Sequence, residues 1–150
     1  MRTWYETMAD VQNERDIIDA YCGLVAPIRG ARLYAHKSKR GCPYDFALTR
    51  GGQTVVAFAE AKRRHCSIGK YDTIMLSLGK WSELVKLNES TRRPVVFVVR
   101  FDDALGSVLI RPSQHEDLRW GGRTRNTRDA ADIEPVIHIP TDSFKVWCQR

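Results

Sequence analysis

The chain has 150 residues, of which 43% are hydrophobic, and it carries a formal net charge of +6 at pH 7. A chain of this length can bury a core of its own, so we expect residues 1–150 to form a single domain. No stretch approaches the roughly 18 apolar residues of a membrane helix and no signal-peptide pattern is present, which predicts a cytoplasmic protein with no membrane partner.

The first predicted element is a helix over residues 3–25. Thr3 and Glu6 have the spacing of a capping box. Apolar residues then recur at helical spacing, at Met8, Val11, Ile18, Tyr21 and Val25. Glu14 occupies the one slot of this stripe where an apolar residue is expected, so it either faces a functional site or is a boundary glutamate that reaches water.

The next residues predict a hairpin. The expected parts are a break over 26–30, a strand over 31–37, a basic approach over 38–42 and two hairpin strands over 44–50 and 53–62. Gly51-Gly52 would form a two-residue turn between the last two strands. A tight turn places Asp45 opposite Phe58 and diagonal to Glu60, on one face of the hairpin, whereas a β-bulge would shift this register by one residue.

Asp45 and Glu60 would thus bring two carboxylates to one point, with Cβ atoms about 7–8 Å apart. Carboxylates this close repel each other unless a cation lies between them, and such ligands suit Mg²⁺. Lys62 points the same way and can hold a water molecule or a phosphate, so the set suits phosphodiester hydrolysis. The alternative is a surface acid beside a solvated strand face, but Glu60 interrupts the apolar run of a buried strand.

Beyond the hairpin, the pattern predicts a helix over residues 71–87 and a strand buried on both faces over residues 94–101. The remaining expected elements are a turn from Asp102 through Gly106 and a returning strand over 107–111. Residues 136–139 and 144–147 are expected to form two short strands, or a strand and a turn. Residues 117–132 contain Trp120 and four arginines and are expected to form a loop. This loop could stack on bases or clamp a nucleic-acid backbone, or it could be an ordinary surface loop with Trp120 tucked down.

Pro43-Tyr44-Asp45, followed by Glu60-Ala61-Lys62, resembles the PD-(D/E)xK nuclease superfamily. Within it, the chain is similar to small Holliday-junction resolvases and compact phage nucleases, over about residues 13–111. The predicted elements have the order of that family, although one extra residue separates Pro43 from Asp45. The resemblance implies an α/β fold with a restriction-endonuclease-like mixed central β-sheet flanked by helices.

The resemblance also implies roles for individual residues. Asp45, Glu60 and the carbonyl of Ala61 would bind Mg²⁺, for which Mn²⁺ can substitute, and Lys62 would position or activate water. The family has an acid on its first helix that completes the metal site, and Glu14 matches it. We expect the slot of Glu14 to overlie the Asp45–Glu60 face when the helix packs on the sheet.

Basic residues surround the predicted site. Residues 20–100 contain fifteen Lys and Arg against five Asp and Glu, which indicates a polyanionic partner. The candidate nucleic-acid-binding residues are Lys37, Ser38, Lys39, Arg40, Arg63, Arg64, Lys70, Ser77 and Lys80. Ser38 and Lys39 could equally belong to a plain loop, and Ser77 and Lys80, which the resemblance brings near the scissile phosphate, could equally be structural. The four cysteines lack the spacing of a zinc site and are expected to be reduced thiols.

These patterns together predict a Mg²⁺-dependent DNA endonuclease, selective for DNA structure and active as a homodimer. One alternative is a non-catalytic DNA-binding module that keeps the nuclease fold. Another is a nuclease that acts on DNA ends or on RNA.

Overall fold

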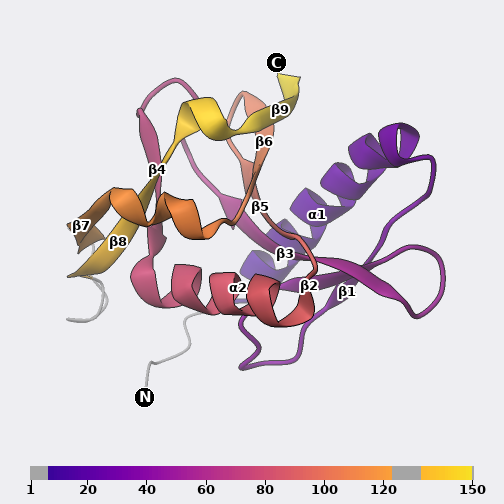
Figure 1. The fold of residues 1–150 in the computed structure, drawn as a ribbon. Coiled ribbons are helices and arrows are strands. Elements are labelled where there is room, and N and C mark those ends of the chain that lie inside the picture. Colours follow the sequence, from indigo (N-terminus) through magenta and orange to yellow (C-terminus); the bar gives the residue numbers. More distant parts are fainter. Residues whose placement is uncertain (1–6, 123–132, 150) are drawn as a thin grey trace.

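The computed structural model describes residues 7–122 and 133–149. The elements, in chain order (Figure 1), are α1 (Met8–Arg29), β1 (Tyr34–Lys37), β2 (Phe46–Thr49), β3 (Val55–Arg63), β4 (Thr73–Ser77), α2 (Leu78–Thr91), β5 (Val95–Arg100), β6 (Ala104–Leu109), the 3-10 helix η1 (Pro112–Glu116), β7 (Leu118–Gly122), β8 (Ile133–Pro140), the 3-10 helix η3 (Thr141–Ser143) and β9 (Lys145–Gln149).

Six strands form a central sheet in the order β1-β2-β3-β5-β6-β9. β3 and β5 pair in parallel, whereas the other neighbouring strands pair antiparallel, so the sheet is mixed. A second, antiparallel sheet has the order β4-β8-β7. The predicted α/β fold with a mixed central sheet flanked by helices is confirmed, but the second sheet was not foreseen.

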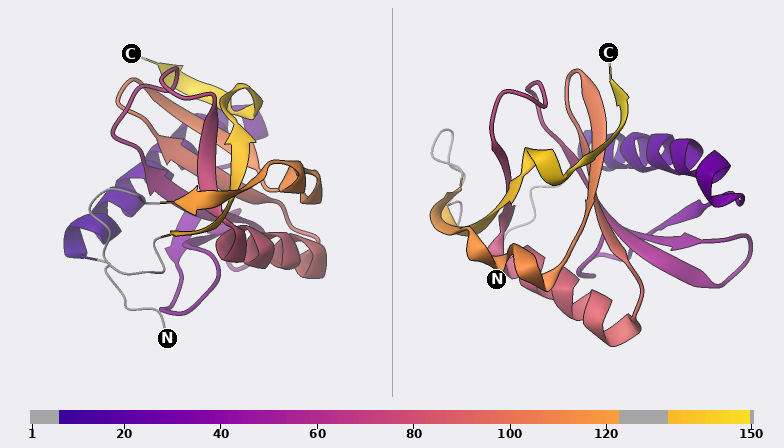
Figure 2. Two further views of the ribbon diagram at one scale, coloured as in Figure 1. Left: turned by 90° about the vertical axis from the view of Figure 1, so that its left-hand side faces the viewer. Right: turned by 45° about the horizontal axis from the view of Figure 1, so that its top comes forward.

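The central sheet is covered on both faces, as Figure 1 shows. On one face, α1 packs its residues Ile17, Ile18, Tyr21, Cys22 and Val25 against apolar side chains of β2, β3, β5 and β6. On the other face, Trp81 and Leu84 of α2 pack together with residues of the second sheet. Both views of Figure 2 show this second sheet beside α2, away from α1. β5 lies between the two layers and is buried along almost its whole length, as its apolar run predicted.

The first helix has a capping box one turn later than the sequence suggested. Thr7 Oγ1 accepts a hydrogen bond from the Asp10 amide at 3.1 Å, and Asp10 Oδ2 accepts one from the Thr7 amide at 2.9 Å. The predicted start at Thr3 lies outside the described residues. The predicted break at residues 26–30 is wrong, because α1 continues through Pro27 and ends at Gly30 with a φ of 67°. Proline so near the C-terminus removes only one helical hydrogen bond, and the burial of Val25 holds this turn on the sheet.

The helix predicted over residues 71–87 is two elements, the strand β4 and the helix α2. Ile74 and Leu76 alternate with less buried neighbours and pair with Ile139 and Ile137 of β8, which is the pattern of a strand. The apolar residues of both elements also fit a helical spacing, so periodicity alone does not separate them. Ser77 ends the strand and caps the helix.

Smaller corrections concern strand ends and turns. β1 begins only at Tyr34, and Gly106 lies inside β6 rather than in the preceding turn. The predicted loop over residues 117–132 begins with the strand β7, and its residues 123–132 lie outside the described part. Trp120 is 74% exposed, so it is not tucked against the protein. No helix in the described parts of the chain is long and apolar enough to cross a membrane.

Candidate active site

The two acids predicted from the hairpin lie across from each other at one end of the β2–β3 pair. Phe46 pairs with Ala59, and continuing this register by one residue places Asp45 opposite Glu60. The Asp45 amide donates to the Ala59 carbonyl at 3.1 Å, and Asp45 Oδ2 accepts from the Ala61 amide at 2.9 Å. These two bonds bracket Glu60 and hold the Asp45 carboxylate beside it.

The predicted register was therefore wrong by two residues. The connection between β2 and β3 spans five residues rather than the expected two, and a bulge lies between Leu48 and Thr49. Gly51 and Gly52 do adopt positive φ angles, of 56° and 100°, as the turn prediction required. Because side chains alternate with a period of two, a two-residue shift keeps both acids on one face and brings them from a diagonal to a direct pair.

The carboxylate of Glu60 is largely buried. Its side chain is 13% exposed, and Oε2 accepts no hydrogen bond from any described residue. Lys80 Nζ lies 3.5 Å from Oε2. Burial, and secondly the charge of Asp45, raise the pKa of Glu60 to about 8, although Lys80 and Lys62 act in the opposite direction. The position favours a neutral acid unless a further positive charge joins the site.

These residues fit a divalent cation. Asp45 uses one carboxylate oxygen for the Ala61 amide, and Glu60 offers an oxygen without a hydrogen bond. No group of three or more His, Cys, Asp and Glu side chains lies close enough to hold a metal ion within residues 7–122 and 133–149. A two-carboxylate site suits a divalent cation that keeps several waters and takes its remaining ligands from substrate phosphates.

Lys62 lies on the same face of β3 as Glu60, two residues further along, and it is partly buried. Its charge lowers the pKa of Glu60, so its ammonium group contributes positive potential at the acid pair. This is the position from which a lysine can hold water or a phosphate oxygen. The part of the predicted site carried by Asp45, Glu60 and Lys62 thus comes together in space.

Glu14 does not overlie the acid pair as expected. α1 packs on the face of β3 that carries Ala59 and Ala61, whereas Glu60 belongs to the opposite face. Glu14 Oε2 instead accepts a hydrogen bond from Lys37 Nζ at 2.8 Å. Its charge nevertheless raises the pKa of Glu60, which places Glu14 near the acid pair.

We predict that Glu14→Gln slows cleavage at limiting Mg²⁺ and that excess Mg²⁺ or Mn²⁺ partly restores the rate. The physical reason is the loss of one negative charge that helps to hold the cation. The control is Lys37→Met, which removes the other half of the ion pair. Equal rates for the wild type and Glu14→Gln at limiting Mg²⁺ would remove Glu14 from the site.

The sequence matches the family described as "Phage putative PDDEXK endonuclease" over residues 1–146. The chain belongs to this family. A search of curated proteins gives no match.

Among solved structures, this endonuclease-family chain is similar to Hjc, a Holliday junction resolvase from the archaeal hyperthermophile Archaeoglobus fulgidus. The two share 17% sequence identity with a TM-score of 0.49, over 88% of this chain and 84% of that one.

The basic residues predicted to contact nucleic acid fall into two groups. Lys39, Arg40 and Lys70 have exposed side chains. Lys37, Arg63 and Arg64 use their charged groups in contacts within the protein. Arg63 Nη2 lies 2.6 Å from Asp102 Oδ1, and Arg64 Nη2 donates to the Met75 carbonyl at 2.9 Å. Burial lowers the pKa of Arg64, and its contact joins the residue that follows β3 to β4. The backbone amide of Ser38 donates to the Asp45 carbonyl at 2.8 Å and so helps to fix the acid-bearing strand.

Ser77 and Lys80 belong to the start of α2. Ser77 is the N-cap, since its Oγ accepts a hydrogen bond from the Lys80 amide at 3.1 Å. Lys80 Nζ makes two contacts with the hairpin region. It donates a hydrogen bond to the Pro43 carbonyl at 3.2 Å, and it lies 3.5 Å from Glu60 Oε2. The contact between Lys80 and Glu60 was not predicted from the sequence. No local signal could have found it, because Lys80 lies in mid-helix when the helix is predicted over residues 71–87 and lies in the first turn only of the observed α2.

We predict that Ser77→Ala lowers the free energy of unfolding by about 1 kcal/mol, because a helix N-cap is lost. Affinity for nucleic acid should remain that of the wild type. Ser77→Asn, which can still cap, should restore the stability in urea unfolding. A fall in affinity with both variants would instead make Ser77 a nucleic-acid contact.

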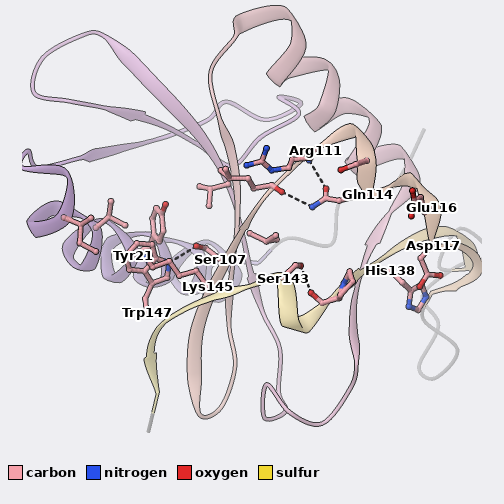
Figure 3. Close-up of a pocket in the computed structure, with 17 residues that line it drawn as sticks. Tyr21, Ser107, Arg111, Gln114, Glu116, Asp117, His138, Ser143, Lys145 and Trp147 are labelled. Atoms are coloured by element: carbon pink, nitrogen blue, oxygen red, sulfur yellow. Dashed lines mark hydrogen bonds between the residues drawn. The ribbon is translucent and has the colours of Figure 1, made fainter.

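A pocket of about 650 Å³ lies elsewhere, between α1, β6, η1 and the C-terminal strands. Figure 3 shows Tyr21 and Trp147 at one end of it and Asp117 and His138 at the other. None of the acids or lysines of the candidate active site lines this pocket. The acid pair lies outside this pocket, between the hairpin and Lys80 of α2.

Proposed function

We propose that the protein is a Mg²⁺-dependent DNA endonuclease that cuts branched DNA in preference to linear duplex. The observation that carries the proposal is the direct pairing of Asp45 with Glu60, whose buried Oε2 has no hydrogen bond from any described residue. Lys62 and the exposed lysines and arginines around the site supply the charge that a phosphodiester substrate needs. The preference for branched DNA extends the resemblance of the motifs to small Holliday-junction resolvases.

The residues divide the work of hydrolysis. Asp45 and Glu60 would hold the cation, with the Ala61 carbonyl and Glu14 in support, and the bound cation would polarise the phosphate and lower the pKa of water. The Asp45 carboxylate is kept in place by the Ala61 amide. Lys62 would orient the attacking water and stabilise the charge that develops on the phosphate. Lys39, Arg40 and Lys70 would contact phosphates away from the reacting bond.

We extend the proposal to a homodimer. One copy of the chain carries one Asp45–Glu60 pair, so two symmetric cuts in a branched substrate require two copies. The mass of the protein in solution, measured by light scattering with and without DNA, tests this part separately.

The activity is tested by incubating the protein with labelled four-way, flapped, linear duplex and single-stranded DNA, and with RNA, in Mg²⁺ or in EDTA. We expect Mg²⁺-dependent cuts in the four-way junction at lower protein concentration than in linear duplex. Tight binding without cleavage in any divalent cation would favour a non-catalytic DNA-binding module. Cuts confined to ends or to RNA would keep the nuclease and change its substrate.

A further inference from the structure

Lys80 joins both halves of the acid motif. Its Nζ lies 3.5 Å from Glu60 Oε2 and donates to the Pro43 carbonyl at 3.2 Å, two residues before Asp45. The side chain is 29% exposed, so the ammonium group lies between the buried acid and solvent. A phosphate that reached the acid pair from this side would therefore meet the Lys80 ammonium group.

The position of Lys80 in α2 is unfavourable for helix stability. It is the third residue after the N-cap Ser77, and the first turn of α2 contains no acid. The N-terminus of a helix carries a partial positive charge, so a lysine there is repelled. Glu60 and the Pro43 carbonyl offset this repulsion, and an incoming phosphate would do so as well.

One ammonium group has a limited number of partners. While Lys80 Nζ is held by Glu60 and Pro43, it is less available to a phosphate of the substrate. A divalent cation bound by Glu60 would weaken the attraction between Glu60 and Lys80, because both cations then compete for one carboxylate. Lys80 would then turn from the carboxylate to the phosphate.

We infer that Lys80 exchanges Glu60 for a substrate phosphate when Glu60 binds a divalent cation, so that cation binding and DNA binding reinforce each other through this side chain. The inference rests on the proposed function and adds to it a coupling between the two ligands. Coupling of this kind is reciprocal, so DNA must raise the affinity for the cation by the same factor.

The test measures the binding of fluorescein-labelled DNA by anisotropy in Ca²⁺ and in EDTA, with a gel to confirm that the DNA remains uncut. We expect Ca²⁺ to raise the affinity of the wild type by about tenfold, within the usual range of such couplings. Lys80→Met should show an enhancement several-fold smaller. Calorimetric titration of Ca²⁺ with and without DNA should give the same factor for each protein.

Two further variants separate this coupling from a structural effect. Lys80→Gln keeps a donor for the Pro43 carbonyl without the charge, so it should lose the enhancement as Lys80→Met does while remaining folded. Lys86→Met, which removes an exposed lysine of the same helix, should keep the enhancement. An enhancement in Lys80→Met or Lys80→Gln equal to that of the wild type, or none in a wild type that cleaves in Mg²⁺, overturns the inference. A wild type that neither binds DNA nor cleaves it overturns the proposed function itself.

Discussion

Glu60→Gln should abolish cleavage and, in EDTA, should make the protein more stable than the wild type at neutral pH. Cleavage should fall to the level of the wild type in EDTA, because the amide is a poor ligand for a hard cation. The gain in stability has a different cause. Burial raises the pKa of Glu60 from 4.5 to about 8, so folding must keep a proton on a group that ionises freely in the unfolded chain.

The sign of the pH dependence follows from this difference. Between about pH 4.5 and 8 the folded state holds one more proton at Glu60 than the unfolded state does. The free energy of unfolding of the wild type therefore falls as pH rises through this window, by about 1.4 kcal/mol per pH unit for one proton. The free energy of unfolding of Glu60→Gln does not fall in this way. The free energies of unfolding of the two proteins should therefore differ least below about pH 4.5 and most above about pH 8.

Urea unfolding in EDTA at several pH values measures the effect. Glu83→Gln, which changes an exposed glutamate of α2, is the matched control and should follow the wild type. Asp45→Asn should also lose cleavage while keeping an oxygen for the Ala61 amide. Parallel pH profiles for the wild type and Glu60→Gln, or cleavage at the wild-type rate in either active-site variant, would refute the assignment.

Lys62→Ala should lose cleavage by roughly 10²- to 10⁴-fold while binding DNA almost as tightly as the wild type. The reason is that Lys62 lies beside the acid pair, whereas affinity is spread over exposed residues such as Lys39, Arg40 and Lys70. Each phosphate contact changes the slope of log affinity against log salt by about one unit, so the slope should stay close to that of the wild type.

The matched control is Lys39→Ala, which removes an exposed lysine of the β1–β2 connection. It should weaken binding, make the salt dependence shallower by about one unit, and keep the cleavage rate at saturating DNA. If Lys62→Ala lost binding and cleavage in equal proportion, Lys62 would be one more backbone contact and not a residue of the reaction.

The parts of the fold that could be predicted were those with one dominant periodic signal. The apolar run of β5 and the stripe of α1 each had one interpretation, and both elements exist. The boundary between β4 and α2 was missed because Ile74, Leu78 and Trp81 satisfy a helical spacing across a strand and a helix alike. What makes residues 73–77 a strand is their pairing with β8, more than fifty residues away in sequence.

In the candidate site, too, the features set by local spacing could be predicted and those set by distant packing could not. Asp45, Glu60 and Lys62 could be placed on one face from alternation within a single hairpin, and an error of two residues in register left that result intact. The partners of Glu14 and Glu60 could not be foreseen in this way. Lys37 and Lys80 reach these acids from other elements, through packing that no local spacing encodes.

Ser77 ends β4 and caps α2, so no linker lies between the three-stranded sheet and the helix that carries Lys80. Because the strand passes directly into the helix, a displacement of the β4-β8-β7 sheet also displaces the first turn of α2. Lys80, the lysine beside Glu60, belongs to this turn and moves with it.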